Sequence, residues 1–246
     1  MIRNATTSDL NQVAELISDS FKATLLPYMI YTQRGIGEFL GAFIAHPGVA
    51  TDRTLLVVVD ADLVIAFAEF RRTDKRAALL SYVCVRSEYR GRGLASLLIR
   101  HYREHASDLQ RIDLDVFADN EPAITLYHKL GFQASGKTMW FVRPLPTVIS
   151  DADDLKIGNM PVAKAVFDRY GFCEIETEWR GEALKVGRIG DTVLRCFDST
   201  SFADDVLLGS LRLAFPEAKE ALLIAPSEPE SGGRRICTSL RMTGVF

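Results

Sequence analysis

Several features that mark particular protein classes are scarce in this 246-residue sequence. Its apolar runs, such as residues 55–59, are far shorter than the roughly 20 residues that a membrane-spanning helix needs. The net charge is only −3, so no broad basic surface for nucleic acid is indicated. Met1 leads directly into a polar segment, and we therefore expect no signal peptide. These shortages predict a protein with neither a membrane nor a nucleic-acid partner.

Cysteine and histidine are also rare. Three of the four histidines fall on predicted helices, and no His/Cys/Asp group has the spacing of metal ligands, so no metal site is predicted. The four cysteines form neither a metal-type pair nor a disulfide framework, which favours a reduced, cytoplasmic protein. They are scattered through apolar, strand-like stretches as Cys84, Cys173, Cys196 and Cys237.

What the chain does contain is typical of a soluble globular protein, with 48% hydrophobic and 25% charged residues. Alternating and helical patterns predict the order strand, helix, helix, three strands, helix, strand, helix and two strands through residue 145. Three glycines weaken the helical pattern within residues 27–46, so we expect that helix to be broken or mobile. The sequence thus predicts an α/β fold with a first domain over 1–145 and a smaller α/β domain over 146–246.

The most informative stretch is a predicted strand over 77–85 followed by a polar turn, two glycines and a new helix. Gly91 and Gly93 would let a ligand approach the backbone closely, because neither carries a Cβ atom. Backbone N–H groups at such a turn, together with a helix N-terminus, can hold a diphosphate. Arg90 and Arg92 would add positive charge, although two glycines alone also suit an ordinary strand-to-helix turn.

The spacing Arg90-x-x-Gly93-x-Ala95 is more specific. It resembles the acyl-CoA-binding signature Arg/Gln-x-x-Gly-x-Gly/Ala of the GCN5-related N-acetyltransferase (GNAT) superfamily. The family's second signature is also present about thirty residues later, as Asn120 and Ala123 followed by Leu126-Tyr127 and Gly131-Phe132. The resemblance covers about residues 1–145, three fifths of the chain.

This resemblance implies a GNAT fold and acetyl-CoA as the co-substrate. In the family, a bulge in the strand before the glycine turn separates it from the next strand, and the pantetheine arm lies in the gap. A backbone N–H of that strand polarises the thioester, the turn takes the pyrophosphate, and the Asn bonds to the pantetheine arm. The residues so implied are Val83, Cys84, Val85, Arg90, Gly91, Arg92, Gly93, Leu94, Ala95, Ser96 and Asn120.

The resemblance also suggests catalytic residues. Tyr127 matches the general acid that protonates the departing sulfur, although a tyrosine here could simply pack in the core. Asp115 lies at a position where some relatives carry the base, and it could equally be a solvated strand carboxylate. Glu69, in a mostly apolar strand that would raise its pKa, is the second candidate. Water or an already neutral amine could also replace a protein base.

Residues 146–246 contain no glycine-rich phosphate turn. Their predicted order of elements loosely repeats that of the first domain, without the Asn–Tyr helix. Ser199 to Phe202 stand where the first domain has Arg90 to Gly93, and Asp204 and Asp205 would repel a diphosphate from the following helix. We therefore expect either a degenerate second GNAT-like unit or an unrelated α/β domain that mediates dimerisation or forms a lid.

The predicted function is acetyl-CoA-dependent N-acetylation of a primary amine, favouring a small molecule as the acceptor. Trp140, Phe141 and the segment 27–46 would line the acceptor pocket, and the second domain would wall it. Acetylation of a protein or peptide N-terminus is the alternative within this activity. A non-catalytic, CoA-binding regulatory protein is a second alternative, and a homodimer built on the C-terminal part is a third. The acceptor, the acyl chain and the oligomeric state are not predicted.

Overall fold

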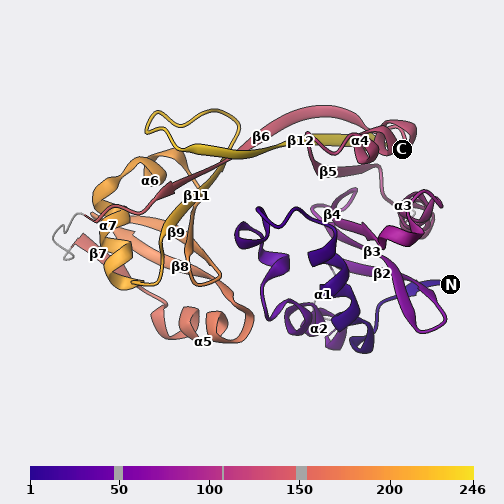
Figure 1. The fold of residues 1–246 in the computed structure, drawn as a ribbon, viewed down its shortest axis with the longest axis horizontal. Helices are drawn as coiled ribbons and strands as arrows, with labels where there is room; N and C mark the ends of the chain where they lie inside the picture. Colours follow the sequence, from indigo (N-terminus) through magenta and orange to yellow (C-terminus); the bar gives the residue numbers. More distant parts are fainter. Residues whose placement is uncertain (47–51, 107, 148–153) are drawn as a thin grey trace. The chain divides into compact units, whose positions relative to one another are not determined.

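The computed structural model describes residues 1–46, 52–106, 108–147 and 154–246 (Figure 1). Contacts within this part of the chain divide it into two compact units. Unit 1 comprises Met1–Lys22, Ile36–Lys137 and Ser239–Phe246, and unit 2 comprises Ala23–Gly35 and Thr138–Thr238. The expected boundary between residues 145 and 146 therefore differs from this division at 23–35, at 138–145 and at 239–246.

Unit 1 is built on a mixed sheet. Its strands follow the order β1-β2-β3-β4-β5-β12, and the first part of β6 lies next to β12. Neighbouring strands are antiparallel from β1 to β4, β4 and β5 are parallel, and β12 is antiparallel to β5. The bounds are β1 (Ile2–Asn4), β2 (Arg53–Asp60), β3 (Leu63–Arg72), β4 (Ala77–Val85), β5 (Arg111–Phe117), β6 (Gln133–Pro144) and β12 (Arg234–Val245).

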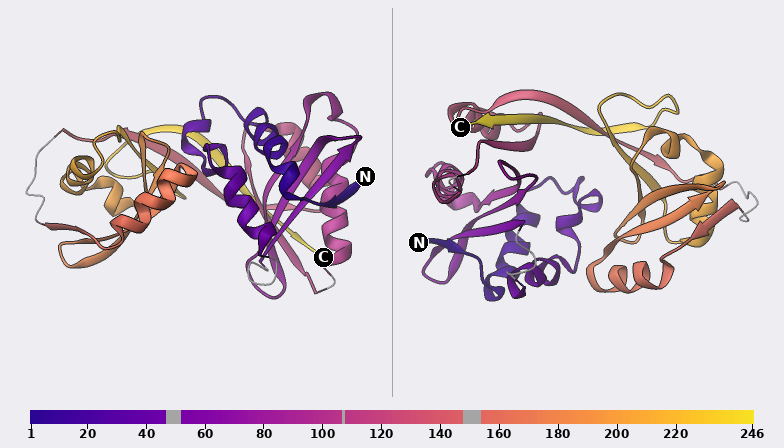
Figure 2. Two further views of the ribbon diagram at one scale, coloured as in Figure 1. Left: turned by 90° about the horizontal axis from the view of Figure 1, so that it is seen from below. Right: turned by 180° about the vertical axis from the view of Figure 1, so that it is seen from behind.

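Helices cover both faces of the unit 1 sheet (Figures 1 and 2). Helices α3 (Leu94–His105) and α4 (Glu121–Lys129) share one buried core with the side chains of alternate strand residues. Helices α1 (Leu10–Asp19) and α2 (Ile36–Ala45) pack against each other, and α1 also contacts β3 and β4. We call the sheet face that bears α1 and α2 the open-edge face, because its edge at β5 and β12 carries partly exposed polar side chains.

Local signals set the start of α1 and the break before α2. Asp9 accepts hydrogen bonds from the Thr6 N–H and hydroxyl at 2.7 and 2.8 Å, which forms a capping box in front of α1. The predicted interruption of the next helix is confirmed. Short 3-10 turns η2 (Leu26–Tyr28) and η3 (Ile30–Thr32) precede α2, and they belong to unit 2.

Unit 2 repeats this architecture. Its sheet has the order β6-β11-β10-β9-β8-β7, in which β10 and β11 are parallel and the remaining neighbours antiparallel. The parallel pair thus lies at the same place as β4 and β5 in unit 1. The bounds are β7 (Leu155–Ile157), α5 (Met160–Tyr170), β8 (Phe172–Trp179), β9 (Glu182–Ile189), β10 (Val193–Cys196), α6 (Ser199–Ala203), α7 (Asp205–Ala214) and β11 (Glu220–Ala225).

Strands β6 and β12 each contribute residues to both units. Residues 239–245 of β12 pair with β5 in unit 1, and residues 139–144 of β6 pair with β11 in unit 2. The prediction of two strands between residues 132 and 143 was wrong, because β6 is one continuous strand. Its first part lies beside β12, where the Ser135 and Thr243 hydroxyls form a hydrogen bond at 2.9 Å. The last strand of unit 1 therefore comes from 239–245.

Residues 199–214 of unit 2 form two helices, α6 and α7, although their sequence suits a single helix. Asp204 has extended backbone angles and accepts hydrogen bonds from the N–H groups of Val206 and Leu207, both at 2.9 Å. An aspartate in this role begins a new helix, so α6 and α7 are separate. Strand β7 was not predicted from the sequence. Within the described ranges, the structure has no helix with the length and apolarity needed to cross a membrane.

Candidate active site

The centre of unit 1 is a β-bulge in β4. Glu69 of β3 pairs with Tyr82, whereas the next residue of β3 pairs with Leu80, so Ser81 is an extra residue. The bulge shifts the alternation of side chains along β4. Ala78 and Leu80 before it, and Val83 and Val85 after it, all pack into the core beneath α3 and α4.

Beyond the bulge, β4 and β5 separate. Their parallel pairing runs from Ala77 opposite Arg111 to Leu80 opposite Leu114, and β4 continues to Val85. The Arg86 N–H donates to the carbonyl of Ile65 in β3 at 2.9 Å. Because successive N–H groups along a strand point to opposite sides, those of Val83 and Val85 point away from β3. They therefore face the gap on the β5 side and can polarise a carbonyl placed there.

The glycine turn after β4 is open to a ligand. Gly91 and Gly93 have φ angles of 75° and 78°, and a Cβ atom added to either would meet no other atom within 4 Å. Gly93 is the N-cap of α3 and provides no side-chain cap. The first backbone N–H groups of α3, from Leu94 to Ser96, have no acceptor within the helix. Together these features form a cradle of donors that suits a diphosphate.

Three arginines brace this cradle. Arg90 donates from Nε to the Val85 carbonyl at 3.1 Å, and Arg86 donates from Nε to the Val64 carbonyl at 2.7 Å. Arg92 donates to the Glu88 carbonyl at 3.0 Å and lies over the Tyr89 ring. Arg90 and Arg92 remain exposed, so their positive charges stay available to an anion at the turn.

Helix α4 carries Asn120 and Tyr127 to the other side of the gap. Asn120 is the N-cap of α4, where its Oδ1 accepts the Ala123 N–H at 3.3 Å. Capping uses the side-chain oxygen, which leaves the amide N–H₂ as donor to a ligand. The helix ends before Gly131, whose φ of 87° matches the predicted glycine C-cap.

Tyr127 is buried, with only 5% of its surface exposed, and its ring lies 5.8 Å from that of Phe132. Burial raises the pKa of the phenol above its ordinary value, and the nearby Cys84 thiol adds to the effect. Among the residues that the structure describes, none forms a hydrogen bond with the Tyr127 hydroxyl. The phenol therefore stays protonated with a proton free to give, as a general acid requires.

The two predicted bases differ in their surroundings. Glu69 is fully buried and forms an ion pair with Arg53, whose guanidinium lies 4.4 Å from the Phe43 ring. Asp115 is the first β5 residue past the last pair with β4, and its side chain is 40% exposed. It makes a bidentate ion pair with Arg241 of β12, with both N···O distances at 2.7 Å. Exposure and position at the gap favour Asp115.

Sequence reasoning missed the residues that surround the gap on the open-edge face. Phe21, just beyond α1, packs edge-to-face on Tyr82 and Phe117 at centroid distances of 5.9 and 6.1 Å. The buried Cys84 thiol contacts Ser20, and burial raises the pKa of this thiol to about 12. Only the broken alternation at Ser81 was a usable local signal, because the other contacts join distant segments.

The corresponding turn in unit 2 is closed. Asp198 accepts the Ser201 N–H and hydroxyl at 2.7 Å each, so its carboxylate occupies the N-terminus of α6. Phe202, which replaces Gly93 in the comparison of the two turns, is fully buried in the unit 2 core. A capping carboxylate repels a diphosphate, and this part of unit 2 offers no counterpart of the open cradle.

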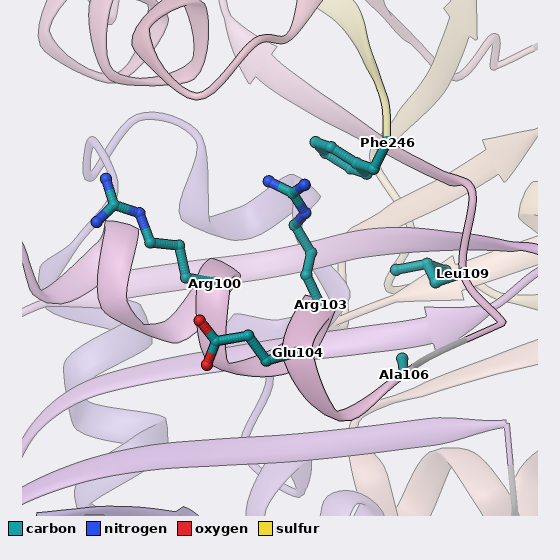
Figure 3. Close-up of a pocket in the computed structure, with 6 residues that line it drawn as sticks. All are labelled: Arg100, Arg103, Glu104, Ala106, Leu109 and Phe246. Atoms are coloured by element: carbon teal, nitrogen blue, oxygen red, sulfur yellow. The ribbon is translucent and has the colours of Figure 1, made fainter.

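A surface pocket of about 350 Å³ lies at the far end of α3 from the glycine turn (Figure 3). Arg103 stacks on Phe246 there, with 3.4 Å between the guanidinium carbon and the ring centroid. The pocket lies at the opposite end of α3 from the glycine turn, so we do not assign it to the reaction. In the described part of the chain, no group of three or more His, Cys, Asp or Glu side chains is placed to hold a metal.

Comparison with known proteins agrees with this geometry. The model of the acetyltransferase (GNAT) family matches residues 10–132. An L-amino acid N-acetyltransferase of Escherichia coli is 34% identical over 96 residues, which cover 37% of this chain and 57% of that protein. A mycothiol acetyltransferase of Corynebacterium glutamicum is 34% identical over 85 residues, which cover 33% of this chain and 28% of the relative. The chain thus matches 57% and 28% of these relatives' lengths.

A structural comparison covers both units. The crystal structure of a GCN5-related N-acetyltransferase from Sphaerobacter thermophilus aligns with 100% of this chain and 95% of its own, with a TM-score of 0.58. Sequence identity is 12%, so this likeness concerns the fold. The likeness of fold therefore extends over both units of this chain.

Proposed function

Because the chain belongs to the acetyltransferase (GNAT) family, we propose that it transfers an acetyl group from acetyl-CoA directly to a primary amine. The observation that carries this proposal is the gap between β4 and β5. It has an open glycine cradle at its mouth, and Tyr127 is buried beside it. Each of these parts answers one requirement of the reaction.

Binding uses backbone groups for the most part. The N–H groups from Gly91 to Ser96 would hold the diphosphate, and Arg90 and Arg92 would supply positive charge. Asn120 would donate its amide N–H to the pantetheine arm. The N–H groups of Val83 and Val85 would then polarise the thioester carbonyl, as donors aimed at an oxygen that gains negative charge.

Asp115 and Tyr127 would move the protons. Asp115 takes a proton from the acceptor's ammonium group, directly or through one water, and frees the nitrogen lone pair. The nitrogen bonds to the carbonyl carbon as the carbon–sulfur bond breaks, and it then releases its second proton to solvent to give the neutral amide. Tyr127 gives its proton to the departing sulfur and regains one from solvent. The products are the acetylated amine and CoA with a free thiol, so no covalent enzyme intermediate is needed.

A small-molecule amine is the acceptor that we favour over a protein N-terminus. The support is the relatives' names, which describe an L-amino acid N-acetyltransferase and a mycothiol acetyltransferase. Aromatic rings of Phe21, Tyr82 and Phe117 next to the gap would suit an acceptor with an apolar part.

The first test is calorimetric titration of the full chain with acetyl-CoA, beside the Gly93→Glu variant. We expect binding by the natural protein and its loss in the variant, because a carboxylate at the mouth of α3 repels the diphosphate. Release of free thiol during incubation with a panel of amines then reports transfer. Binding without any transfer would contradict the enzyme and favour a CoA-responsive regulatory protein. Unchanged binding by Gly93→Glu would contradict the assigned cradle.

A further inference from the structure

The acceptor amine can reach the gap from one face of the unit 1 sheet only. On the other face, α3 and α4 pack over β4 and β5, and the side chains of Leu80, Leu114 and Tyr127 fill the space between them. On the open-edge face, Asp115 and Arg241 project beside the gap and are 40% and 43% exposed. An approaching acceptor therefore meets this ion pair first.

The Asp115–Arg241 pair has the geometry to bind a zwitterion. The planar guanidinium of Arg241 presents two parallel N–H donors to the Asp115 carboxylate, and the same fork can hold a ligand carboxylate. Asp115 would then accept hydrogen bonds from the ligand's ammonium group. In an α-amino acid one carbon separates the two charged groups, so they can engage two side chains that lie next to each other.

Exchanging the internal pair for a ligand has a small energetic cost. Exposed ion pairs contribute little to stability, because water screens both charges. When a zwitterion binds, its ammonium group takes the place of Arg241 beside Asp115, and its carboxylate takes the place of Asp115 beside Arg241. Neither side chain is then left unpaired. A simple amine would satisfy Asp115 and leave Arg241 without its carboxylate, which disfavours such an acceptor.

Two other carboxylates near the gap are also paired. Asp113 pairs with Arg111 at 3.1 Å, and Asp119 pairs with Lys22.

Gly136 of β6 lies beside the stem of the Arg241 side chain. A Cβ atom added to it would lie 3.7 Å from the Arg241 Cβ, which is an ordinary contact distance. A methyl group would therefore fit, whereas a larger, branched side chain would crowd the stem that positions the guanidinium.

We infer that Arg241 and Asp115 bind the carboxylate and the ammonium group of the acceptor, so the acceptor is a free amino acid or a closely related amino-carboxylate. This inference rests on the proposed acetyltransferase activity and narrows it. Arg241 determines specificity in this scheme, and Asp115 both orients the amine and removes its proton.

The test compares three acceptors that share one side chain: L-phenylalanine, L-phenylalaninamide and phenethylamine. Thiol release at saturating acetyl-CoA gives kcat/KM for each, with the natural chain and with Arg241→Gln, Arg241→Lys and Gly136→Val. We expect the natural protein to prefer the amino acid. Arg241→Gln should lower kcat/KM for the amino acid about 10- to 100-fold, the range for a lost charged hydrogen bond, and should not lower it for phenethylamine, which leaves Arg241 unpaired.

Arg241→Lys should restore part of the preference, since the charge remains without the fork. Gly136→Val should raise KM for the amino acid alone. Arg111→Gln is the matched control, because it removes an ion-paired arginine at the other end of β5, and it should change nothing. Any of three results would overturn the inference. These are equal kcat/KM for the three acceptors, transfer only to the acceptors without a carboxylate, and an equal loss for all three acceptors in Arg241→Gln. Any such transfer leaves the proposed function intact, whereas failure to bind acetyl-CoA would refute that function itself.

Discussion

Replacing Tyr127 with phenylalanine should separate catalysis from stability. The change removes only the hydroxyl, and the ring keeps its place beside Phe132. Loss of a general acid costs a factor of about 10² to 10⁴ in kcat, or about 3 to 5 kcal/mol in the activation free energy. The free energy of unfolding should change by less than about 1 kcal/mol, because the ring stays packed and the hydroxyl makes no hydrogen bond with the described residues.

The assay pairs thiol-release kinetics with urea unfolding of the same preparations. Tyr102→Phe is the matched control, since Tyr102 is also 5% exposed in the same core and stacks on Phe70 at 3.8 Å. It should retain full activity. Because burial raises the pKa of Tyr127, the kcat of the natural protein should not fall between about pH 7 and 9. Unchanged kcat in Tyr127→Phe, or a loss of stability above about 1 kcal/mol, would refute the role given to the hydroxyl.

Three further predictions concern stability. Asp9→Asn should lower the unfolding free energy by about 1 to 2 kcal/mol at pH 7, because hydrogen bonding from Arg3 lowers the pKa of Asp9 from 3.8 to about 2. This stabilisation is fully present above pH 3.8 and lost as pH falls through 2, so urea titrations at pH 7 and 3 should show the difference between the proteins shrink. Gly35→Ala should destabilise the chain by about 1 to 3 kcal/mol, since its Cβ would lie 2.4 Å from the Arg169 carbonyl oxygen and the Tyr170 Cα. Gly37→Ala should be neutral or stabilising in thermal melts, because the added Cβ would meet Leu10 of α1 no closer than 3.8 Å. Deleting residues 239–246 should abolish acetyl-CoA binding and give aggregates in gel filtration, because β5 loses its neighbour; a monomeric, binding-competent product would contradict the strand assignment.

Local patterns predicted the parts of the candidate site that are local in the chain. The strand over 77–85, the glycine turn and the start of α3 at Leu94 depend on alternation, on glycine's freedom at positive φ and on the apolar stripe of the helix. The family signatures then indicated roles for Asn120 and Tyr127, and those roles remain predictions. The structure adds their surroundings, namely a cap for Asn120 and burial for Tyr127.

Contacts between distant segments could not be predicted in this way. Arg241 and Asp115 are separated by 126 residues, and nothing in the sequence around either one indicates the other. The continuity of β6 depends on its pairing with β12, which a pattern read along one segment does not reveal. The break at Asp204 was equally hidden, because an aspartate in the first turn and an aspartate that caps a new helix look alike in the sequence.

The late position of β12 in the sequence has a consequence for folding during synthesis of the chain. During synthesis, β1 to β5 emerge long before residues 239–245, so the edge of β5 has no neighbour until about 120 further residues have been added. An unpaired strand edge can associate with other nascent chains during this interval. The exposed side of β5 alternates charged residues, Arg111, Asp113 and Asp115, with its apolar ones. We therefore expect these charges to protect the half-made protein from aggregation, a duty separate from anything they do in the finished molecule.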